Sequence, residues 1–349
     1  MQKFTIARDS KWYFAFPDLL LTKSGTLLCS WTECTHHSDR SHSRILLAHS
    51  SDHGRSWSAP VPLTEATDNL PFHYNCSRMA QLRDGRIALS IDKITIDPEH
   101  THSEAISSIF LYFSQDDGNS WSQTVATGIS GIMPDKLTEL PNGRWLLGTH
   151  KRFQEKLTQY VAYSDNLGET WTKEVIVARD PNLNLCEVSM VPAGGKDVIA
   201  FMRENSGLGY DCKKVISHDY GSTWGPVIDF PIPGCHRPTA GWLQDGHLLI
   251  TCRFMQGGKG WLGTWMQNTF ACLSDRNSAL ATSRKDAWTR ILPIEYDRSP
   301  VSDGGYTGWV QFPNGEIYIA NYCVDDNDGR GQIRGYALTL NDFLLPTNQ

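Results

Sequence analysis

SSDHGRSW, at positions 50–57, is the first of four copies of one eight-residue phrase. The other copies are SQDDGNSW (114–121), SDNLGETW (164–171) and SHDYGSTW (217–224). Self-similarity of this kind indicates a repeat architecture. The acidic or amide residue of the phrase can accept hydrogen bonds from turn N–H groups, and its Gly permits positive φ. The phrase therefore predicts a hairpin turn whose closing Trp packs between repeated units.

A second repeat runs out of phase with the first. Each copy is an apolar run, a turn ending in Gly and another apolar run, which is a strong hairpin signal. The six copies are PDLLLTKSGTLL (17–28), RMAQLRDGRIAL (78–89), KLTELPNGRWLL (136–147), SMVPAGGKDVIAF (189–201), GWLQDGHLLI (241–250) and WVQFPNGEIYIA (309–320). Their spacing leaves room for four short strands in each unit.

Together the repeats predict an all-β fold, a six-bladed β-propeller of four-stranded antiparallel blades. The Gly hairpin should join the two inner strands of a blade and the Trp phrase the two outer ones. Residues 274–288 are expected to be an expanded copy of the phrase, and KFTIAR (3–8) should close the ring by pairing with IRGYALTL (333–340). No linker or low-complexity stretch divides the chain, so residues 1–349 are expected to form one domain.

Composition limits the classes of partner. The formal net charge is −6 and the basic residues are scattered, which argues against nucleic acid or an anionic membrane. No apolar stretch approaches the length of a membrane span, and MQKFTIARDS lacks a signal-peptide core. The nine Cys are odd in number and form no CxxC pair, which favours reduced thiols and a cytoplasmic protein without a metal site.

Polar residues recur where the innermost strand of each blade begins. Because these strands start at the same rim, such residues should surround one central pocket, which suits a polyhydroxylated, acidic ligand. Asp18 and Lys136 could instead cap or bridge strand ends. The set comprises Pro17, Asp18, Asn75, Arg78, Pro134, Asp135, Lys136, Glu187, His236, Arg237, Asp303 and Tyr306.

The four Trp phrases resemble the Asp-box (BNR) repeats of the sialidase superfamily, and the six Gly hairpins fall where that family has its inner strands. The resemblance covers nearly the whole chain. It implies a glycoside hydrolase that acts on an oligosaccharide or glycoside substrate and needs no cofactor. Asp boxes specify the blade architecture more than the chemistry, because non-catalytic propellers also carry them.

The resemblance also implies catalytic residues. The nucleophilic tyrosine of the family would be Tyr306 in DGGYTGWVQFPNG, and its glutamate partner would be Glu187 in NLCEVSMV. A phenol with an ordinary pKa near 10 is a poor nucleophile unless a nearby carboxylate takes its proton. The acid/base aspartate would be Asp39, in the loop TECTHHSDRSHSR (32–44). His36, His37 and Glu33 are its rivals in that loop; the adjacent histidines should point apart, so no metal site is expected there.

Sialidases hold the carboxylate of their substrate with three arginines, whose forked N–H groups suit bidentate bonding. Arg203 in FMRENSG supplies one, and Arg237 or Arg253 supplies another from the fifth blade. The third position, before the proline that opens the first blade, holds Ala15. Arg78 or Arg44 could complete the clamp from another direction. His236, Asp135, Asp18 and Asp303 are the further expected substrate contacts.

Three functions fit these residues. The first is an exo-acting glycosidase of sialidase-like build, with Tyr306 and Glu187 as the nucleophile pair and Asp39 as the acid/base. The second is a glycosidase that uses two carboxylates on another sugar, drawn from Glu187, Asp135, Asp18 and Asp303, whose separation would decide retention or inversion. The third is a sugar-binding propeller without catalysis. The sequence does not specify the sugar or the oligomeric state.

Overall fold

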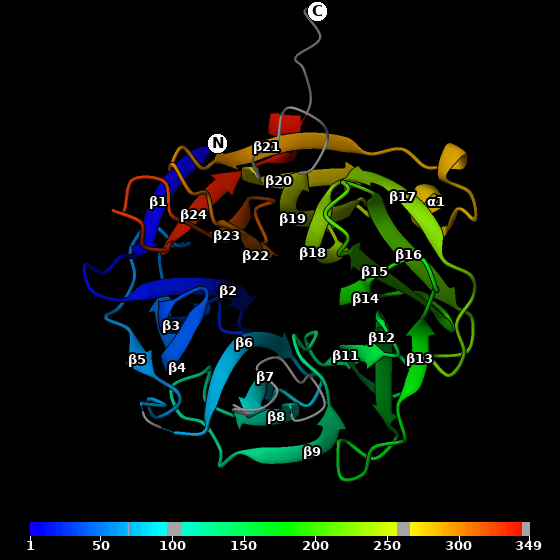
Figure 1. Ribbon diagram of the computed structural model, residues 1–349, viewed down its shortest axis with the longest axis horizontal. Helices are drawn as coiled ribbons and strands as arrows, with labels where there is room; N and C mark the ends of the chain where they lie inside the picture. The colour runs from blue at the N-terminus through cyan, green and yellow to red at the C-terminus, as the bar shows by residue number, and fades with distance from the viewer. Residues whose placement is uncertain (69, 96–106, 257–265, 344–349) are drawn as a thin grey trace, which may run out of the picture.

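Six sheets surround a common axis, and the innermost strands of these sheets lie nearest to it (Figure 1). This computed structural model describes residues 1–68, 70–95, 107–256 and 266–343. Each sheet has four strands that pair in antiparallel order, and the sheets follow one another around a closed ring (Figure 1). The predicted six-bladed propeller is therefore confirmed.

The first three blades take their strands in chain order, from the axis outward. They are β2 (Tyr13–Leu21), β3 (Leu27–His36), β4 (Asp39–Ser50) and β5 (Val61–Pro62); β6 (Phe72–Gln81), β7 (Ile87–Thr95), β8 (Ser107–Ser114) and β9 (Val125–Ser130); and β10 (Thr138–Glu139), β11 (Trp145–Phe153), β12 (Lys156–Ser164) and β13 (Val175–Ala178).

The fourth and fifth blades follow the same rule, and the sixth borrows its outermost strand from the start of the chain. They are β14 (Leu185–Gly194), β15 (Asp197–Glu204), β16 (Asp211–Ser217) and β17 (Ile228–Pro233); β18 (Cys235–Trp242), β19 (Leu248–Gln256), β20 (Met266–Ser274) and β21 (Arg290–Tyr296); and β22 (Gly304–Gln311), β23 (Ile317–Cys323), β24 (Gln332–Leu338) and β1 (Gln2–Ala7). The antiparallel pairing of β1 with β24 confirms the predicted ring closure.

Helices are short and few in the described ranges. They are α1 (Arg276–Leu280), η3 (Arg284–Asp286) and η4 (Leu340–Phe343). No helix in this part of the chain has the length and apolar character needed to cross a bilayer.

Each Trp phrase forms the turn between the third and fourth strands of its blade. In the first copy, Oδ1 of Asp52 accepts the N–H of Ser56 at 2.9 Å, and the Ser50 hydroxyl accepts the N–H of Gly54 at 2.9 Å. Gly54 has φ of 80°, a backbone conformation that residues with a side chain rarely adopt. The Trp57 ring packs 6.4 Å from the ring of Tyr318 in the neighbouring blade. The predicted turn chemistry and inter-blade packing are both confirmed.

The fifth blade keeps this turn in an enlarged form. Asp275 accepts hydrogen bonds from the N–H of Ser278 at 2.7 Å and from the indole of Trp288 at 3.0 Å, while α1 and η3 fill the space between them. Residues 274–288 are thus the predicted expanded copy.

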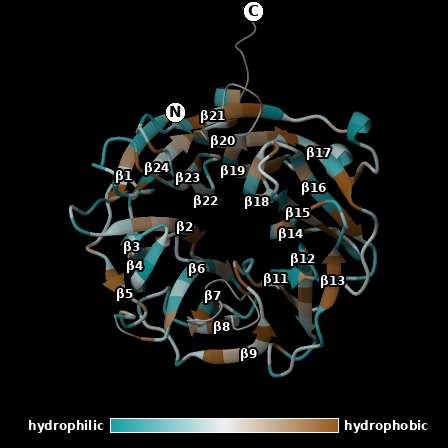
Figure 2. Ribbon diagram, viewed as in Figure 1, coloured by the Kyte–Doolittle hydropathy of each residue, from teal (hydrophilic) through white to brown (hydrophobic). Residues whose placement is uncertain are grey.

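The apolar core is divided among the interfaces between blades. Five of the six clusters of buried residues in the described part of the chain combine side chains from two neighbouring blades, for instance Phe201 of β15 with Ile250 of β19. The remaining cluster joins the sixth and first blades and also includes Cys76 and Met133. Apolar residues are accordingly spread over all the blades and do not gather on one side (Figure 2). All nine Cys are buried and free of disulfides.

Candidate active site

A bulge interrupts the inner strand of at least five blades at the same level. Between the regular pairs of β14 and β15, for example, Glu187 and Val188 lie opposite a single residue. The equivalent shifts fall between Ala15 and Asp18, Tyr74 and Ser77, His236 and Thr239, and Gly304 and Thr307. The first bulge residue has φ of 57° at Phe16, 53° at Glu187, 50° at Arg237 and 91° at Gly305. Left-handed backbone at non-glycine residues costs free energy and clusters at functional sites, so this level of the ring is a candidate site.

Two of these bulges bring Tyr306 and Glu187 together across the ring. The Tyr306 hydroxyl donates to Oε1 of Glu187, and the Arg203 Nη1 atom lies 2.9 Å from that oxygen and 3.0 Å from the phenol oxygen. The three side chains come from β22, β14 and β15. Glu187 Oε2 and Arg203 Nε are buried and have no hydrogen-bond partner among the described residues. Two unpaired buried polar atoms next to a tyrosine–carboxylate pair suit a bound polar ligand.

The electrostatics of this pair favour a carboxylate facing a neutral phenol. Burial raises the pKa of Glu187, but the guanidinium groups of Arg203 and Arg237 and the Tyr306 hydrogen bond outweigh it, so the pKa lies well below its ordinary value. Burial and the charge of Glu187 raise the pKa of Tyr306 above its ordinary value, against the opposing effect of Arg203 and Arg253. At neutral pH Glu187 is therefore ionised and accepts the hydrogen bond of the neutral phenol.

A second cluster adjoins the first through Arg253. The Arg253 guanidinium carbon lies 4.3 Å from the centre of the Tyr306 ring. Its Nη2 atom donates to the Tyr322 hydroxyl at 2.7 Å and lies 3.5 Å from Asp303 Oδ1. Asp303 also accepts the Tyr13 hydroxyl at 2.6 Å. Of the two fifth-blade arginines predicted from the sequence, Arg253 is thus the one in contact with the Tyr306 ring.

Arg237 and His236, at the bulge of β18, are buried within the protein. Arg237 donates to the carbonyl oxygens of Met133 at 3.1 Å and Pro134 at 2.9 Å. Burial and the charges of Arg203 and Arg253 lower the pKa of His236 well below its ordinary value, and its Nδ1 atom is buried without a partner in the described ranges. Arg237 therefore acts on the site through its charge, while His236 has a free polar atom.

Asp18 and Asp135 belong to a different arrangement, which we call the polar belt. It consists of the six residues that directly follow the bulge level, each bonded to a neighbouring blade: Asp18, Ser77, Asp135, Ser189, Thr239 and Thr307. Asp18 accepts the N–H of Met79 at 2.7 Å, and Asp135 accepts the N–H of Met190 at 2.7 Å. Their roles as substrate contacts stay predictions.

Arg78 ties the belt together across the axis. Its Nη1 atom lies 3.0 Å from Oδ1 of Asp18 and donates to the carbonyl of Thr307 at 2.9 Å, while Nη2 donates to Thr239 at 2.8 Å. Arg78 is 2% exposed, so its guanidinium group interacts with protein groups and not with solvent. Substrate binding by Arg78 stays a prediction.

The hairpin that joins β3 and β4 carries Asp39 at its exposed end. Oδ1 of Asp39 accepts the N–H of Ser41 at 2.9 Å, and this bond lowers the pKa of the carboxyl group below its ordinary value. Asp39 has no hydrogen bond to the Tyr306 cluster among the described residues. Its neighbour His37 does reach the site: its ring centre lies 5.3 Å from that of Phe16, which in turn lies 5.2 Å from Tyr306.

Arg40, on the same hairpin, also adjoins the candidate site, although the sequence did not single it out. Its guanidinium carbon lies 4.9 Å from the centre of the Phe16 ring, and its Nη1 atom is buried without a partner in the described ranges. Ala15, where the resemblance places a first arginine, is fully buried. Arg40 thus brings a guanidinium from the hairpin to the ring of the residue beside Ala15. Arg44, by contrast, is held by Glu33 at 2.6 Å.

A cavity of about 670 Å³ opens beside the second cluster. Its wall includes Tyr13, His37 and Asp303 together with residues 299–302 and 324–326. Within the described part of the chain, no group of three or more His, Cys, Asp or Glu side chains could hold a metal ion. The chemistry available here is therefore that of a phenol, two carboxylates, an imidazole and guanidinium groups.

Residues 25–319 match the model of the BNR repeat-like domain family. The chain belongs to this family. Its repeats and its six blades make this BNR repeat-like protein a member of the sialidase-like superfamily. A sialidase of Bacteroides fragilis (strain YCH46) is 24% identical over 190 residues, which are 52% of this chain and 34% of that protein. The chain thus spans about a third of the length of that relative.

Solved structures share the whole fold of this BNR repeat-like protein. A protein of unknown function from Dyadobacter fermentans DSM 18053 matches 97% of both chains at 22% identity, with a TM-score of 0.76. The NanB sialidase of Streptococcus pneumoniae matches 97% of this chain and 70% of that one at 14% identity, with a TM-score of 0.72. At these identities the likeness shows the fold alone.

Proposed function

We propose that the protein is an exo-acting glycoside hydrolase of sialidase-like build that removes a terminal acidic sugar from an oligosaccharide or glycoside. The observation that carries this proposal is the buried hydrogen bond from Tyr306 to Glu187, with Arg203 bonded to both. A buried phenol next to a carboxylate is an activated nucleophile. The sialidase relative and the sialidase fold match support the same reaction class.

In the proposed reaction the Tyr306 oxygen attacks the anomeric carbon while its proton passes to Glu187. The bond from the anomeric carbon to the leaving oxygen breaks, and that oxygen takes up a proton from an acid. A water molecule then attacks the anomeric carbon and gives its proton to the conjugate base of that acid. The bond between that carbon and the Tyr306 oxygen breaks, and Tyr306 recovers its proton from Glu187. The Arg203 charge stabilises the phenolate in both steps because it lies 3.0 Å from the phenol oxygen.

Three guanidinium groups support the choice of an acidic sugar. Arg203 and Arg253 adjoin Tyr306, and Arg40 approaches from the hairpin. The unpaired Nε of Arg203 and Nη1 of Arg40 are free to bind a substrate carboxylate. The two-carboxylate mechanism has less support, because Asp18 and Asp135 already accept backbone N–H groups of neighbouring blades.

The test is the activity of a Tyr306→Phe variant on a panel of aryl glycosides that includes the sialoside. We expect kcat/KM to fall at least about 100-fold, because the nucleophile is lost. Tyr296→Phe is the matched control, since Tyr296 is 56% exposed on β21. A mass increase on the peptide that contains Tyr306, after reaction with an activated fluoroglycoside, would support the covalent step. Wild-type activity in Tyr306→Phe would contradict the proposal, and binding without turnover by the wild type would indicate a sugar-binding propeller.

A further inference from the structure

His37 and Asp303 form a pair at the edge of the Tyr306 site. The His37 Nδ1 atom lies 2.5 Å from Oδ2 of Asp303. His37 comes from the hairpin that follows β3, and Asp303 directly precedes β22, the strand that carries Tyr306. The side chain of His37 is 38% exposed and that of Asp303 is 13% exposed. A solvent-accessible imidazole is therefore oriented by a largely buried carboxylate.

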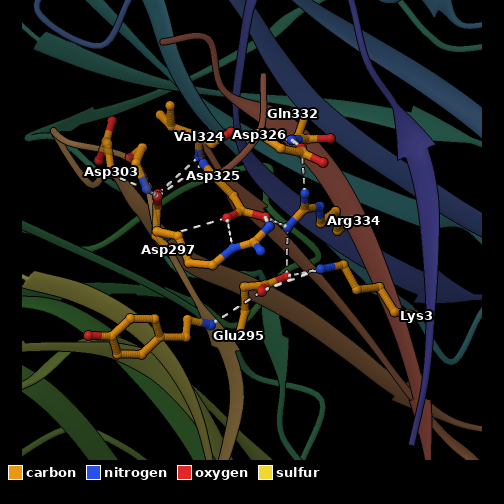
Figure 3. Close-up of polar contacts among 12 residues, drawn as sticks. Lys3, Glu295, Asp297, Asp303, Val324, Asp325, Asp326, Gln332 and Arg334 are labelled. Atoms are coloured by element: carbon orange, nitrogen blue, oxygen red, sulfur yellow. Dashed lines mark hydrogen bonds and ion pairs between the residues drawn. The ribbon is translucent and has the colours of Figure 1, made fainter. Parts of the chain in front are cut away.

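Asp303 is held firmly by its surroundings. The Tyr13 hydroxyl donates to Oδ2 at 2.6 Å and the Tyr322 hydroxyl to Oδ1 at 2.9 Å. Its backbone N–H donates to Asp297 at 3.2 Å, in the network that also holds the N–H groups of Val324 and Asp325 (Figure 3). Burial raises the pKa of Asp303, but His37 and Arg253 more than offset it, so the pKa lies well below its ordinary value. Asp303 is thus a fixed carboxylate that orients His37 through Nδ1.

The other ring nitrogen of His37 is free to act. In the described ranges its Nε2 atom makes no hydrogen bond, and the side chain lines the cavity of about 670 Å³. His37 and Tyr306 both contact Phe16 and Tyr322, with ring-centre distances of 5.3 and 6.5 Å for His37 and of 5.2 and 6.2 Å for Tyr306. The imidazole therefore lies across these rings from the nucleophile, on the side of the cavity.

We propose that the His37–Asp303 pair is the general acid and base of this site and that the cavity beside it receives the leaving group. This inference rests on the proposed function. In the first step the His37 Nε2–H gives its proton to the leaving oxygen as that oxygen separates from the anomeric carbon. In the second step Nε2 takes a proton from the attacking water, so the imidazolium is restored. Asp303 accepts the Nδ1–H bond throughout.

Asp39 is the competing acid, since the resemblance assigns it that role. Its carboxyl group is exposed, accepts the N–H of Ser41 and has a lowered pKa, so it is ionised at neutral pH and has no proton to give. His37 also has the fixed carboxylate partner that Asp39 lacks.

The experiment compares two glycosides of the same sugar, namely the aryl glycoside that the wild type cleaves best in the panel and its methyl glycoside. His37→Gln keeps a side-chain N–H for Asp303 but cannot transfer a proton. An aryl leaving group departs with little protonation, whereas methoxide needs it. We expect His37→Gln to lose about 10²- to 10⁴-fold in kcat/KM on the methyl glycoside and about 10-fold or less on the aryl glycoside. His218→Gln, which breaks an exposed His–Asp pair of 2.8 Å, should change neither.

Equal losses of His37→Gln on both glycosides, or no loss on either, would overturn the role of His37. A selective loss on the methyl glycoside in Asp39→Asn but not in His37→Gln would assign the acid to Asp39. Both results leave the proposed function intact. Inactivity of the wild-type protein on the entire panel, or an active Tyr306→Phe variant, would overturn the proposed function and this inference with it.

Discussion

Arg40 brings a positive charge to the candidate site from the hairpin between β3 and β4. Ala15 leaves no room for an arginine on β2, because it is fully buried among Phe14, Phe16 and Trp31. Arg40 instead places its guanidinium over the Phe16 ring from the neighbouring hairpin. Cation–π contacts of this kind hold an arginine while leaving its edge N–H groups available.

Replacing Arg40 with Met should therefore weaken the binding of an acidic glycoside. We expect KM to rise about 10- to 100-fold, because one charge-assisted hydrogen bond is lost, while kcat changes little. Steady-state kinetics on the best aryl glycoside of the panel measure both constants. Arg86→Met is the control, since Arg86 lies 4.8 Å from the Phe113 ring in a similar contact on the second blade. An unchanged KM in Arg40→Met would show that Arg40 does not bind substrate.

His150 gives the stability a pH dependence that can be measured. Burial lowers the pKa of His150 to about 3, against an ordinary value of about 6.5. The unfolded chain therefore takes up this proton first, and the free energy of unfolding falls as the pH drops below about 6.5, by about 1.4 kcal/mol per pH unit for this group. Urea unfolding between about pH 6 and about pH 4 should show a slope smaller by this amount in His150→Gln. An identical slope in the variant would mean that His150 is not buried in its neutral form.

Sequence reasoning could identify Tyr306, Glu187 and Arg203 because each has a fixed place relative to a Gly hairpin. The structure brings these three side chains together. Sequence reasoning named His37 only as a rival of Asp39 and did not name Arg40, because the contacts of both residues depend on how an irregular hairpin folds over the inner strands. Nor could it separate the polar belt from the site, since Asp18 lies only two residues after Phe16 along β2.

At the scale of the element, the Trp-phrase turn is a spacer between blades. A Cβ atom at Gly54 would lie 2.4 Å from the ring of Tyr318 on the adjacent blade, and Gly118 would meet Leu28 in the same way. The glycine is thus needed for close approach as well as for its positive φ. Sequence reasoning predicted the second requirement from the local turn, but the first depends on a contact 264 residues away in the chain.

Gly54→Ala and Gly315→Ala separate these two requirements. Gly315 has φ of 87° and no atom within 4 Å of its Cβ position, so its replacement should cost about 1 kcal/mol of unfolding free energy. Gly54→Ala should cost about 1–3 kcal/mol more, because the Tyr318 ring must shift. Urea unfolding measures both values. If both substitutions lowered the free energy of unfolding equally, the close contact between Gly54 and Tyr318 would not constrain the spacing of the two blades.

At the scale of the whole molecule, the polar belt links the blades around the axis below the site. Arg78 contributes most, since it contacts groups of the first, fifth and sixth blades from the second. The belt fixes the strand segments next to the bulges, so the site residues of different blades keep their relative positions.

Arg78→Met should reduce the free energy of unfolding by about 3–5 kcal/mol, because it leaves the buried Asp18 carboxylate without its partner. The double variant Arg78→Met/Asp18→Asn should recover part of this loss, since the uncompensated charge is then removed. Urea unfolding gives the free energies, and KM on the aryl glycoside gives the functional readout. If Arg78→Met raised KM without lowering the free energy of unfolding, the result would instead support substrate binding by Arg78, as the sequence predicts.

The pairing of β1 with β24 also has a consequence for the order of folding. Gln2 pairs with Ala337, so the outermost strand of the sixth blade is synthesised first and its partner more than 300 residues later. Until then β1 has no neighbour, and the first five blades can assemble only as an open arc. Contacts this distant in the chain slow folding, and unpaired strand edges invite association between chains. The last pairing event therefore decides when the β24 edge is covered by β1 and can no longer pair with a strand of another chain.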